Sequence, residues 1–266
     1  MPEKRSYAPG QFCWSEVGVR DAGQAKQFYA KLLGWKAVDV PIDGGGNYTL
    51  MRLGDTDVAG LYELSKEQLA QGVPPAWLAY VAVESADRST ELAKTLGAQV
   101  MTGPFDVMTL GRMSVIADPQ GAAFAIWQAK EHKGSGLLGE NGTAGWCELA
   151  TKDVHKAKEF YSQLFGWRLD TKSDKGREYT EIAAGGMQVG GMMALTPDHG
   201  PTPPHWLTYF MVGDCDEHVG VAQKNGGKVL VPPMNIPKVG RFAVLADPSG
   251  AAFAVIKLDF TGHMKA

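Results

Sequence analysis

The sequence lacks the features that mark several large classes of protein. Its three cysteines, Cys13, Cys147 and Cys215, are too few and odd in number for a disulfide framework. With 26 Lys and Arg against 29 Asp and Glu, it lacks the basic excess typical of nucleic-acid-binding proteins. No stretch approaches the roughly 18 consecutive apolar residues of a membrane-spanning helix. The N-terminal MPEKRSYAPGQFCW also lacks the apolar segment of a signal peptide. We therefore expect a protein of a reducing compartment, most simply cytoplasmic, with no nucleic-acid or membrane partner.

What the sequence does contain is an internal repeat. Residues 12–35 and 144–167 are identical at ten of 24 positions. Residues 111–126 and 240–255 are identical at 11 of 16 positions, and both segments contain the sequence ADPxG. Self-similarity on this scale is typical of a duplicated structural unit.

The length of the chain agrees with a duplication. Its 266 residues, 44% of them hydrophobic, are enough for two domains of ordinary size. Residues 131–143 are rich in Gly and charged side chains and show no sustained periodicity, which is typical of a linker. We predict a first domain over residues 1–130, a linker over 131–143 and a second domain over 144–266.

Each copy is predicted to contain the order strand, helix and three strands, twice. Residues 12–19 alternate as a strand does, and the apolar residues of 21–33 recur on one helical face. Asp21 is a plausible N-cap of that helix, and Gly34 a plausible end. Strands follow near 35–41, 47–53 and 58–64, and the same order returns less regularly over 77–128. The chain is therefore predicted to be α+β, with four βαβββ modules and mainly antiparallel sheets.

The repeated motifs resemble those of one known family. The opening of vicinal-oxygen-chelate modules is similar to the order found here: an Asp, a helix that contains Phe28-Tyr29, and then Gly34-Trp35. The ADPxG sequence resembles the closing turn of those modules. That superfamily includes glyoxalases, bleomycin-resistance proteins and extradiol dioxygenases. The resemblance implies tandem glyoxalase-like domains, each a curled sheet whose concave face holds a metal ion or a small molecule.

The same resemblance places the metal ligands of the family at positions that carry no ligand here. His, Glu or Gln is expected at each of these positions, whereas indole and aliphatic side chains cannot coordinate a metal ion. The residues found are Trp14, Gly60, Leu78 and Ala125 in the first copy, and Trp146, Gly191, Leu207 and Ala254 in the second. The first copy has no histidine in its predicted folded part, because His132 falls in the linker. We expect no cofactor and no metal, with a divalent metal as the alternative if this alignment is wrong.

Glu16 and Glu148 are the candidate catalytic residues. Strand alternation places each on the same face as Trp14 or Trp146, which is the concave face if the tryptophan takes the usual ligand position. A carboxyl in an apolar, aromatic cleft has a raised pKa, which suits a general acid or base. The alternative is a structural Glu that accepts hydrogen bonds from nearby backbone or tyrosine groups.

Several aromatic residues recur in the two copies and are candidates for binding a ligand, since pockets are commonly aromatic with few polar groups. Ordinary core packing is the alternative for each. The candidate ligand-binding residues are Trp14, Tyr48, Trp77, Tyr80, Trp146, Tyr179, His205, Trp206 and Tyr209. Arg112 and Arg241 are interpreted either as clamps for an anion or as salt-bridge partners.

Three functions remain open from the sequence. The first is a metal-free protein that binds or sequesters an apolar or aromatic small molecule, as a monomer or a homodimer. The second is a metal-independent isomerase or lyase with Glu16 or Glu148 as proton shuttle. The third is a metal-dependent lyase or isomerase of the glyoxalase I kind. The sequence does not name the ligand.

Overall fold

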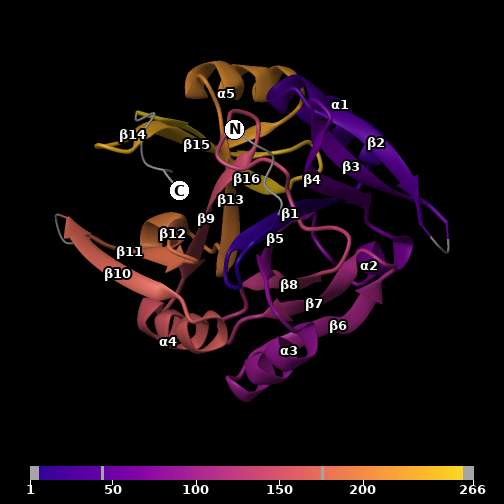
Figure 1. The fold of residues 1–266 in the computed structure, drawn as a ribbon. Coiled ribbons are helices and arrows are strands. Elements are labelled where there is room, and N and C mark those ends of the chain that lie inside the picture. The colour runs from indigo at the N-terminus through magenta and orange to yellow at the C-terminus, as the bar shows by residue number, and fades with distance from the viewer. Residues whose placement is uncertain (1–5, 43–44, 175–176, 260–266) are drawn as a thin grey trace.

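The computed structural model describes residues 6–42, 45–174 and 177–259. Within these ranges the chain folds into two domains of the same design (Figure 1). None of the helices in the described ranges is both long and apolar enough to cross a membrane.

The first domain contains eight strands and three helices in the predicted order. The short helix α2, which the sequence analysis did not predict, is the one addition. The elements are β1 (Phe12–Val19), α1 (Ala22–Leu33), β2 (Lys36–Pro41), β3 (Asn47–Leu53), β4 (Thr56–Glu63), α2 (Lys66–Ala70), β5 (Ala76–Ala82), α3 (Ala86–Thr95), β6 (Gln99–Val107), β7 (Gly111–Ala117) and β8 (Ala123–Ala129).

The second domain repeats this order, with a short 3-10 helix in place of α2. Its elements are β9 (Ala144–Thr151), α4 (Val154–Phe165), β10 (Arg168–Asp174), β11 (Arg177–Ala184), β12 (Met187–Ala194), η1 (Pro197–His199), β13 (His205–Met211), α5 (Cys215–Lys224), β14 (Lys228–Ile236), β15 (Gly240–Ala246) and β16 (Ala252–Leu258).

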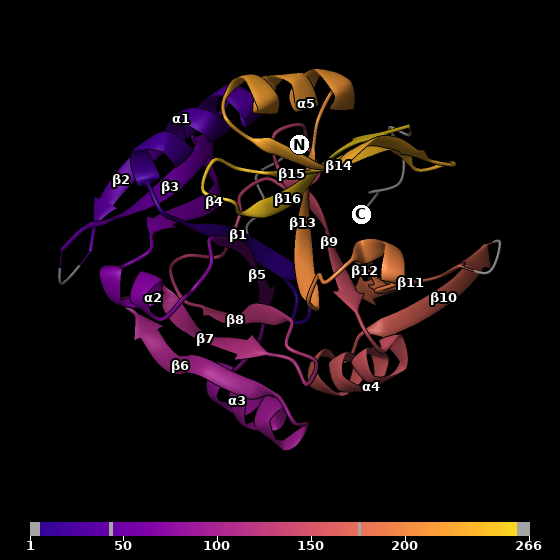
Figure 2. The ribbon, with the colours of Figure 1, turned by 180° about the vertical axis from the view of Figure 1, so that it is seen from behind.

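Each domain builds one eight-stranded sheet, in the order β2-β3-β4-β1-β5-β8-β7-β6 for the first. The pairs β1–β4 and β5–β8 are parallel and the others are antiparallel. The α+β fold of four modules with mainly antiparallel sheets is therefore confirmed. Each sheet curls without closing, and the helices lie on its outer side (Figures 1 and 2). We call the side that carries helices the helix face and the other side the concave face.

The predicted caps fix the ends of the long helices. The Asp21 carboxylate accepts a hydrogen bond from the backbone of Gln24 at 2.9 Å, and Asp153 does the same for α4. Gly34 and Gly166 end their helices with φ of 73° and 66°, a left-handed conformation that glycine adopts without strain. The repeated sequence thus produces two matching strand–helix units.

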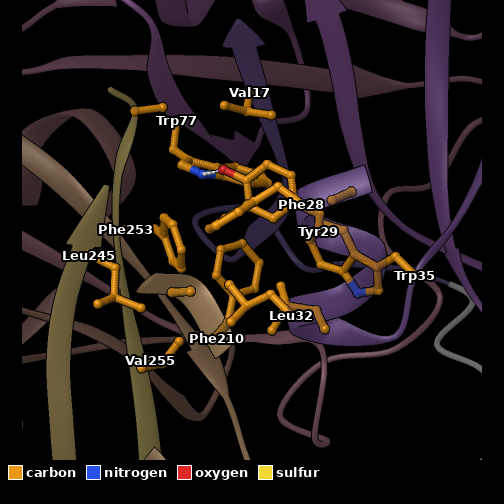
Figure 3. Packing of buried hydrophobic residues seen from close by; sticks show 14 of the residues in the cluster. Val17, Phe28, Tyr29, Leu32, Trp35, Trp77, Phe210, Leu245, Phe253 and Val255 are labelled. Atoms are coloured by element: carbon orange, nitrogen blue, oxygen red, sulfur yellow. Dashed lines mark hydrogen bonds between the residues drawn. The ribbon is translucent and has the colours of Figure 1, made fainter. Parts of the chain in front are cut away.

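The hydrophobic core is shared between the two domains. One buried cluster joins α1 of the first domain to α5, β13, β15 and β16 of the second (Figure 3). A second cluster joins the α3 side of the first domain to β9, α4 and β11 of the second. In both ribbon views α1 lies beside α5, and the two helices are in contact. The domains therefore bury their helix faces together.

Trp77 and Trp206 belong to this shared core, and their predicted place in the cleft wall is wrong. Each is only 6–7% exposed, and Trp77 packs edge-on against Phe210 of the other domain at 4.9 Å between ring centroids. Trp77 and Tyr80 are three residues apart in β5, and an odd separation in a strand places two side chains on opposite faces. Only Tyr80 reaches the concave face.

The ADPxG turns also hold the domains together. Tyr29 of the first domain donates a hydrogen bond to Asp247 of the second at 3.0 Å. Tyr161 of the second donates to Asp118 of the first at the same distance. The indole N–H of Trp77 donates to the Tyr29 hydroxyl at 2.9 Å, which completes a buried chain across the interface. The Tyr of each long helix and the Asp of each ADPxG turn, which recur in both copies, thus hold the two domains together.

The segment predicted as a linker is packed against the fold. Ser135 and Thr143 are buried, at 1% and 0% exposure. The backbone N–H of Ser135 donates to Cys13 at 2.7 Å, and the carbonyl of Gly142 accepts from the Trp35 indole at 2.6 Å. The backbone N–H of Gly142 also donates to the carbonyl of Met211 in the second domain at 2.8 Å. The connection is therefore an ordered part of the structure, because its polar backbone groups are paired with both domains.

Candidate functional site

The concave face of the first sheet carries one carboxylate among aromatic side chains. Alternation along β1 directs Trp14 and Glu16 to this face, opposite to the buried Val17. Trp14 lies opposite Tyr80 in the antiparallel pair β1–β5. Tyr48 arrives from β3, two strands away across β4. Strand alternation predicted that Trp14 and Glu16 share a face, and the structure brings Tyr48 and Tyr80 to the same place.

Both oxygens of Glu16 accept hydrogen bonds from tyrosines. The Tyr80 hydroxyl donates to Oε1 at 2.6 Å, and the Tyr48 hydroxyl donates to Oε2 at 2.9 Å. The Trp14 indole N–H in turn donates to the Tyr48 hydroxyl at 3.0 Å. The result is a closed polar network at the centre of an otherwise apolar face, in which each donor is already satisfied.

The second domain contains the same network. Tyr209 and Tyr179 donate to the two oxygens of Glu148 at 2.7 and 2.8 Å. Trp146 donates to the Tyr179 hydroxyl at 2.9 Å. Four equivalent side chains thus adopt one arrangement in both copies, and we call each set a Trp–Tyr–Glu–Tyr network.

Glycine is required beneath each network. A Cβ atom placed on Gly60 would lie within van der Waals overlap of the Tyr48 hydroxyl, and one on Gly191 would do the same with Tyr179. These glycines occupy the strand between the carboxylate and its tyrosine, since Glu16 pairs with Gly60 and Glu148 with Gly191. The missing side chain is therefore what allows the tyrosine to reach across to the glutamate.

Burial raises the pKa of Glu16 and of Glu148, because an apolar surrounding disfavours the charged carboxylate. The hydrogen bonds from the tyrosines act in the opposite direction but do not outweigh burial. Burial and the neighbouring carboxylate also raise the pKa of Tyr48 and Tyr80, so both phenols stay protonated donors. The arrangement can hold or exchange one proton at the carboxyl group while its tyrosines remain neutral.

An apolar row extends from each network to the edge of its sheet. Tyr80 contacts the sulfur of Met113 at 3.8 Å, and Met113 pairs across the strands with Phe105. Phe105 lies on the edge strand β6 and is 42% exposed. In the second domain Tyr209, Phe242 and Met234 occupy the equivalent positions, and Met234 is 47% exposed. Each row therefore runs from a buried network to an apolar side chain that is exposed at the sheet edge.

The residues of this face do not fit a divalent metal ion. The positions expected to supply ligands do lie around the network, as the pairings of Trp14 with Tyr80, of Glu16 with Gly60 and Leu78, and of Tyr80 with Ala125 show. Their side chains are indole, phenol, hydrogen or aliphatic, and the single carboxylate has both oxygens bonded to tyrosine. Within the described ranges, no group of three or more His, Cys, Asp and Glu is arranged to hold a metal ion.

Other predicted residues lie away from the networks. Arg112 binds Asp87 of α3 at 2.8 Å, and Arg241 binds Asp216 of α5 at the same distance, so both arginines lie toward the helices. Cys147 is buried on the helix face, where burial raises the pKa of its thiol to about 12. His205, by contrast, lies on the concave face of the second domain, at the start of β13.

His132 is a residue of the first concave face that the sequence did not indicate. His132 was expected to lie in the linker, outside the fold, and that placement is wrong. Its ring packs edge-on against Trp14 at 4.6 Å between centroids and against Trp127 at 6.0 Å. Nothing in the local sequence indicated this contact, because the segment 130–135 has no periodicity and meets Trp14 only through the return of the chain after β8.

Comparisons with known proteins agree with the fold and the duplication. A family model described as Glyoxalase/Bleomycin resistance protein/Dioxygenase superfamily matches residues 12–126 and 143–255. A Mycobacterium tuberculosis protein named "Putative glyoxylase CFP32" is 39% identical over 259 residues, covering 97% of this chain and 98% of its own. The anthracycline biosynthesis protein DnrV of Streptomyces peucetius is 36% identical over 264 residues, covering 95% and 94%.

Solved structures show the same fold at low sequence identity. The 2,3-dioxygenase LapB from Pseudomonas sp. KL28 superposes with a TM-score of 0.63 at 14% identity, covering 96% of this chain and 94% of that one. A Mn(II)-bound glyoxalase from Novosphingobium aromaticivorans gives a TM-score of 0.62 at 14% identity, covering 97% and 86%. At this identity the likeness concerns the fold and not the chemistry.

Proposed function

The chain belongs to the glyoxalase/bleomycin resistance protein/dioxygenase superfamily, and on that premise we propose that it binds an apolar, aromatic small molecule on a concave face without a metal ion. The observation that carries the proposal is the Trp–Tyr–Glu–Tyr network at the inner end of an apolar row. The row offers surface for a flat ligand, and the network offers the polar groups that orient it.

The chemistry of the network defines the ligand further. Tyr179 and Tyr209 each hold a hydroxyl whose proton is directed at Glu148, so a ligand meets phenol oxygens and a carboxyl of raised pKa. A ligand hydroxyl can donate to a phenol oxygen, and a ligand carbonyl can accept from the carboxyl group when that group is protonated, while the ligand rings contact Phe242 and Met234. A planar aromatic compound with oxygen substituents satisfies both requirements.

The relatives support this class of ligand. The Streptomyces peucetius protein is named an anthracycline biosynthesis protein and matches this chain over nearly its whole length. Anthracyclines are fused aromatic rings that carry hydroxyl and carbonyl oxygens, and the concave face offers apolar side chains beside phenol and carboxyl groups as complementary partners. We therefore propose a polycyclic aromatic metabolite in preference to a small aliphatic aldehyde.

A second function, proton transfer on that ligand, is favoured by the raised pKa of both glutamates. A carboxyl whose pKa is raised toward neutrality can give a proton to one atom of a bound molecule and accept one from another. With Tyr179 and Tyr209 holding the carboxyl in place, such a step would isomerise a hydroxylated or carbonyl-bearing ring. The reaction would need no metal ion to stabilise charge.

Titration calorimetry with 1,8-dihydroxyanthraquinone, joined to elemental analysis of the purified protein, tests the proposal. We expect saturable binding, and a clear loss of affinity in the double variant Glu16→Gln/Glu148→Gln. Glu159→Gln is the matched control, because Glu159 is exposed on α4, away from the networks. Stoichiometric Ni, Zn, Fe or Mn in active protein would overturn the metal-free proposal. Equal affinity in the double variant would show that the networks do not contact the ligand.

A further inference from the structure

The two concave faces differ at the end where Trp14 and Trp146 lie. After β8 the chain turns back over the first face, and the backbone N–H groups of Lys130 and His132 both donate to Leu110, at 3.0 and 3.1 Å. The Trp127 indole donates to the carbonyl of His132 at 2.9 Å. These bonds hold the segment 130–135 across the open end of the sheet.

His132 covers the tryptophan of the first network. Its ring meets Trp14 nearly perpendicularly, at 86° between planes. Trp14 and Trp127 are each only 6% exposed as a result. The Tyr7 hydroxyl donates to the carbonyl of Ser135 at 2.5 Å, which fixes the far side of the segment. The surface that a ligand ring would contact beside Trp14 is thus occupied by the chain itself.

The first face is also filled at its other end. Tyr62 lies so close to Gly18 that an added Cβ there would be 2.8 Å from the Tyr62 hydroxyl. The pairing of Gly18 with Tyr62 in β1–β4 explains this contact. Tyr62 therefore takes up space next to Glu16 that lies outside the network.

Among the residues that the structure describes, the second face differs from the first at several of these positions. Trp146 is half-buried, and no ring contact to it is formed among those residues. In the paired β9–β12 strands Met193 stands opposite Ala150, at the place that Tyr62 and Gly18 take in the first domain. Ile256 replaces Trp127 at the equivalent position of the closing strand.

The second face also carries a polar group that the first lacks. Glu148 pairs with Leu207, so His205 is the diagonal neighbour of Glu148 on the same face. In ordinary sheet geometry the Cα atoms of such neighbours lie about 7–8 Å apart. Its Nδ1 atom lies 2.9 Å from the carbonyl of Pro203, which leaves Nε2 for another partner. The equivalent residue of β5 is Ala76, which offers no polar atom.

We infer that the two concave faces have diverged, so that the ligand binds only on the second face, between Glu148 and His205, while the first face is covered by its own chain. The inference rests on the proposed function for the identity of the ligand, but the closure of the first face does not. Binding on the first face would require the segment 130–135 to leave Trp14 and give up its hydrogen bonds.

Hydroxyl-radical footprinting of the full chain, read by mass spectrometry, tests the inference. Without ligand, Trp146 should be oxidised several-fold faster than Trp14, because the residue type is the same and only its covering differs. With saturating 1,8-dihydroxyanthraquinone, Trp146 should be protected while the rate at Trp14 stays unchanged. Equal rates without ligand, or protection of Trp14 by the ligand, would overturn the inference.

Matched variants separate the inference from the proposed function. His132→Ala should speed oxidation of Trp14, whereas His155→Ala, a change at an exposed position of α4, should not. His205→Ala should weaken binding of the anthraquinone several-fold, and the counterpart change Ala76→His should leave it unaltered. The variants His205→Ala and Ala76→His leave the packed segment 130–135 unaltered, so they test ligand binding without disturbing that segment. If the anthraquinone protects neither tryptophan while the difference in their rates persists, the proposed function fails and the closure of the first face stands. Unchanged affinity in His205→Ala would refute the assignment of the ligand to that position.

Discussion

Removal of the Tyr48 hydroxyl is the most direct test of the Trp–Tyr–Glu–Tyr network. In Tyr48→Phe the ring stays and two hydrogen bonds are lost, one to Glu16 at 2.9 Å and one from Trp14 at 3.0 Å. The carboxylate oxygen Oε2 and the indole N–H both lose their partner in a partly buried setting. The variant therefore reports what the network contributes without changing the shape of the face.

The expected loss of stability follows from the two bonds. A hydrogen bond to a charged group contributes about 1.5–3 kcal/mol, and a neutral one about 0.5–1.5 kcal/mol. Their sum predicts that Tyr48→Phe lowers the free energy of unfolding by about 2–4.5 kcal/mol at neutral pH. In a chain of this size each 1 kcal/mol lowers the melting temperature by about 2–4 °C.

The loss should depend on pH in a defined direction. Burial raises the pKa of Glu16 above its unfolded value, so its stabilising contribution is complete below that value and is lost as pH rises through the folded pKa. Removal of Tyr48 takes away one of the hydrogen bonds that favour the charged form. The difference between variant and wild type should therefore be larger at pH 8 than at pH 5, since the bond to a protonated carboxyl is weaker.

Urea unfolding of wild type and variants at the two pH values measures both effects. Tyr62→Phe is the matched control, since Tyr62 is a phenol next to Glu16 for which no hydrogen bond is formed among the described residues. A double-mutant cycle with Trp14→Phe should give a coupling of about 0.5–3 kcal/mol. If Tyr48→Phe and Tyr62→Phe cost the same within about 0.5 kcal/mol, the network contributes nothing specific and the reasoning is refuted.

Three further outcomes follow from the structure. Gly191→Ala should destabilise the protein and displace Tyr179, because the new methyl group overlaps its hydroxyl; near-UV circular dichroism unchanged from wild type would contradict this. Asp247→Ala should lower the free energy of unfolding by about 1–3 kcal/mol, since the buried Tyr29 hydroxyl loses its acceptor across the domain interface; a melting temperature equal to that of wild type would show that the contact is not needed. Burial lowers the pKa of His132 from its usual 6.5, against a smaller opposing effect of Asp57. The stability that the buried neutral imidazole contributes is therefore present above pH 6.5 and is lost as the pH falls toward the folded pKa. His132→Phe should accordingly lose less stability than wild type between pH 7 and 5, and identical pH profiles would argue that His132 stays neutral or is solvated throughout.

Some of the site could be predicted from sequence because it depends on local periodicity. Alternation along β1 is enough to place Trp14 and Glu16 on one face, and the repeat shows that Trp146 and Glu148 do the same. The same rule, applied strictly, would also have separated Trp77 from Tyr80, which stand three positions apart. The opposite orientations of Trp77 and Tyr80 therefore follow from local periodicity alone.

Other parts of the site depend on contacts between distant segments. Tyr48 and Tyr80 meet Glu16 from 32 and 64 residues away, and their meeting requires the strand order β3-β4-β1-β5. The role of Gly60 can be understood only once that order is known, because Tyr48 occupies the space that a side chain at position 60 would take. A list of repeated aromatics cannot distinguish these partners from residues of the core.

The duplicated sequence by itself determined the two-domain α+β fold and the caps of the long helices. It also determined that each tryptophan shares a strand face with its glutamate. All of these features follow from short-range patterns that occur twice in the sequence. Only the tertiary structure decided how the two copies pack together and where they differ. Tyr29 reaches Asp247 across 218 positions, and His132 reaches Trp14 from a segment without periodicity. Such contacts arise from how whole sheets pack and where the chain returns afterwards, which no local pattern encodes.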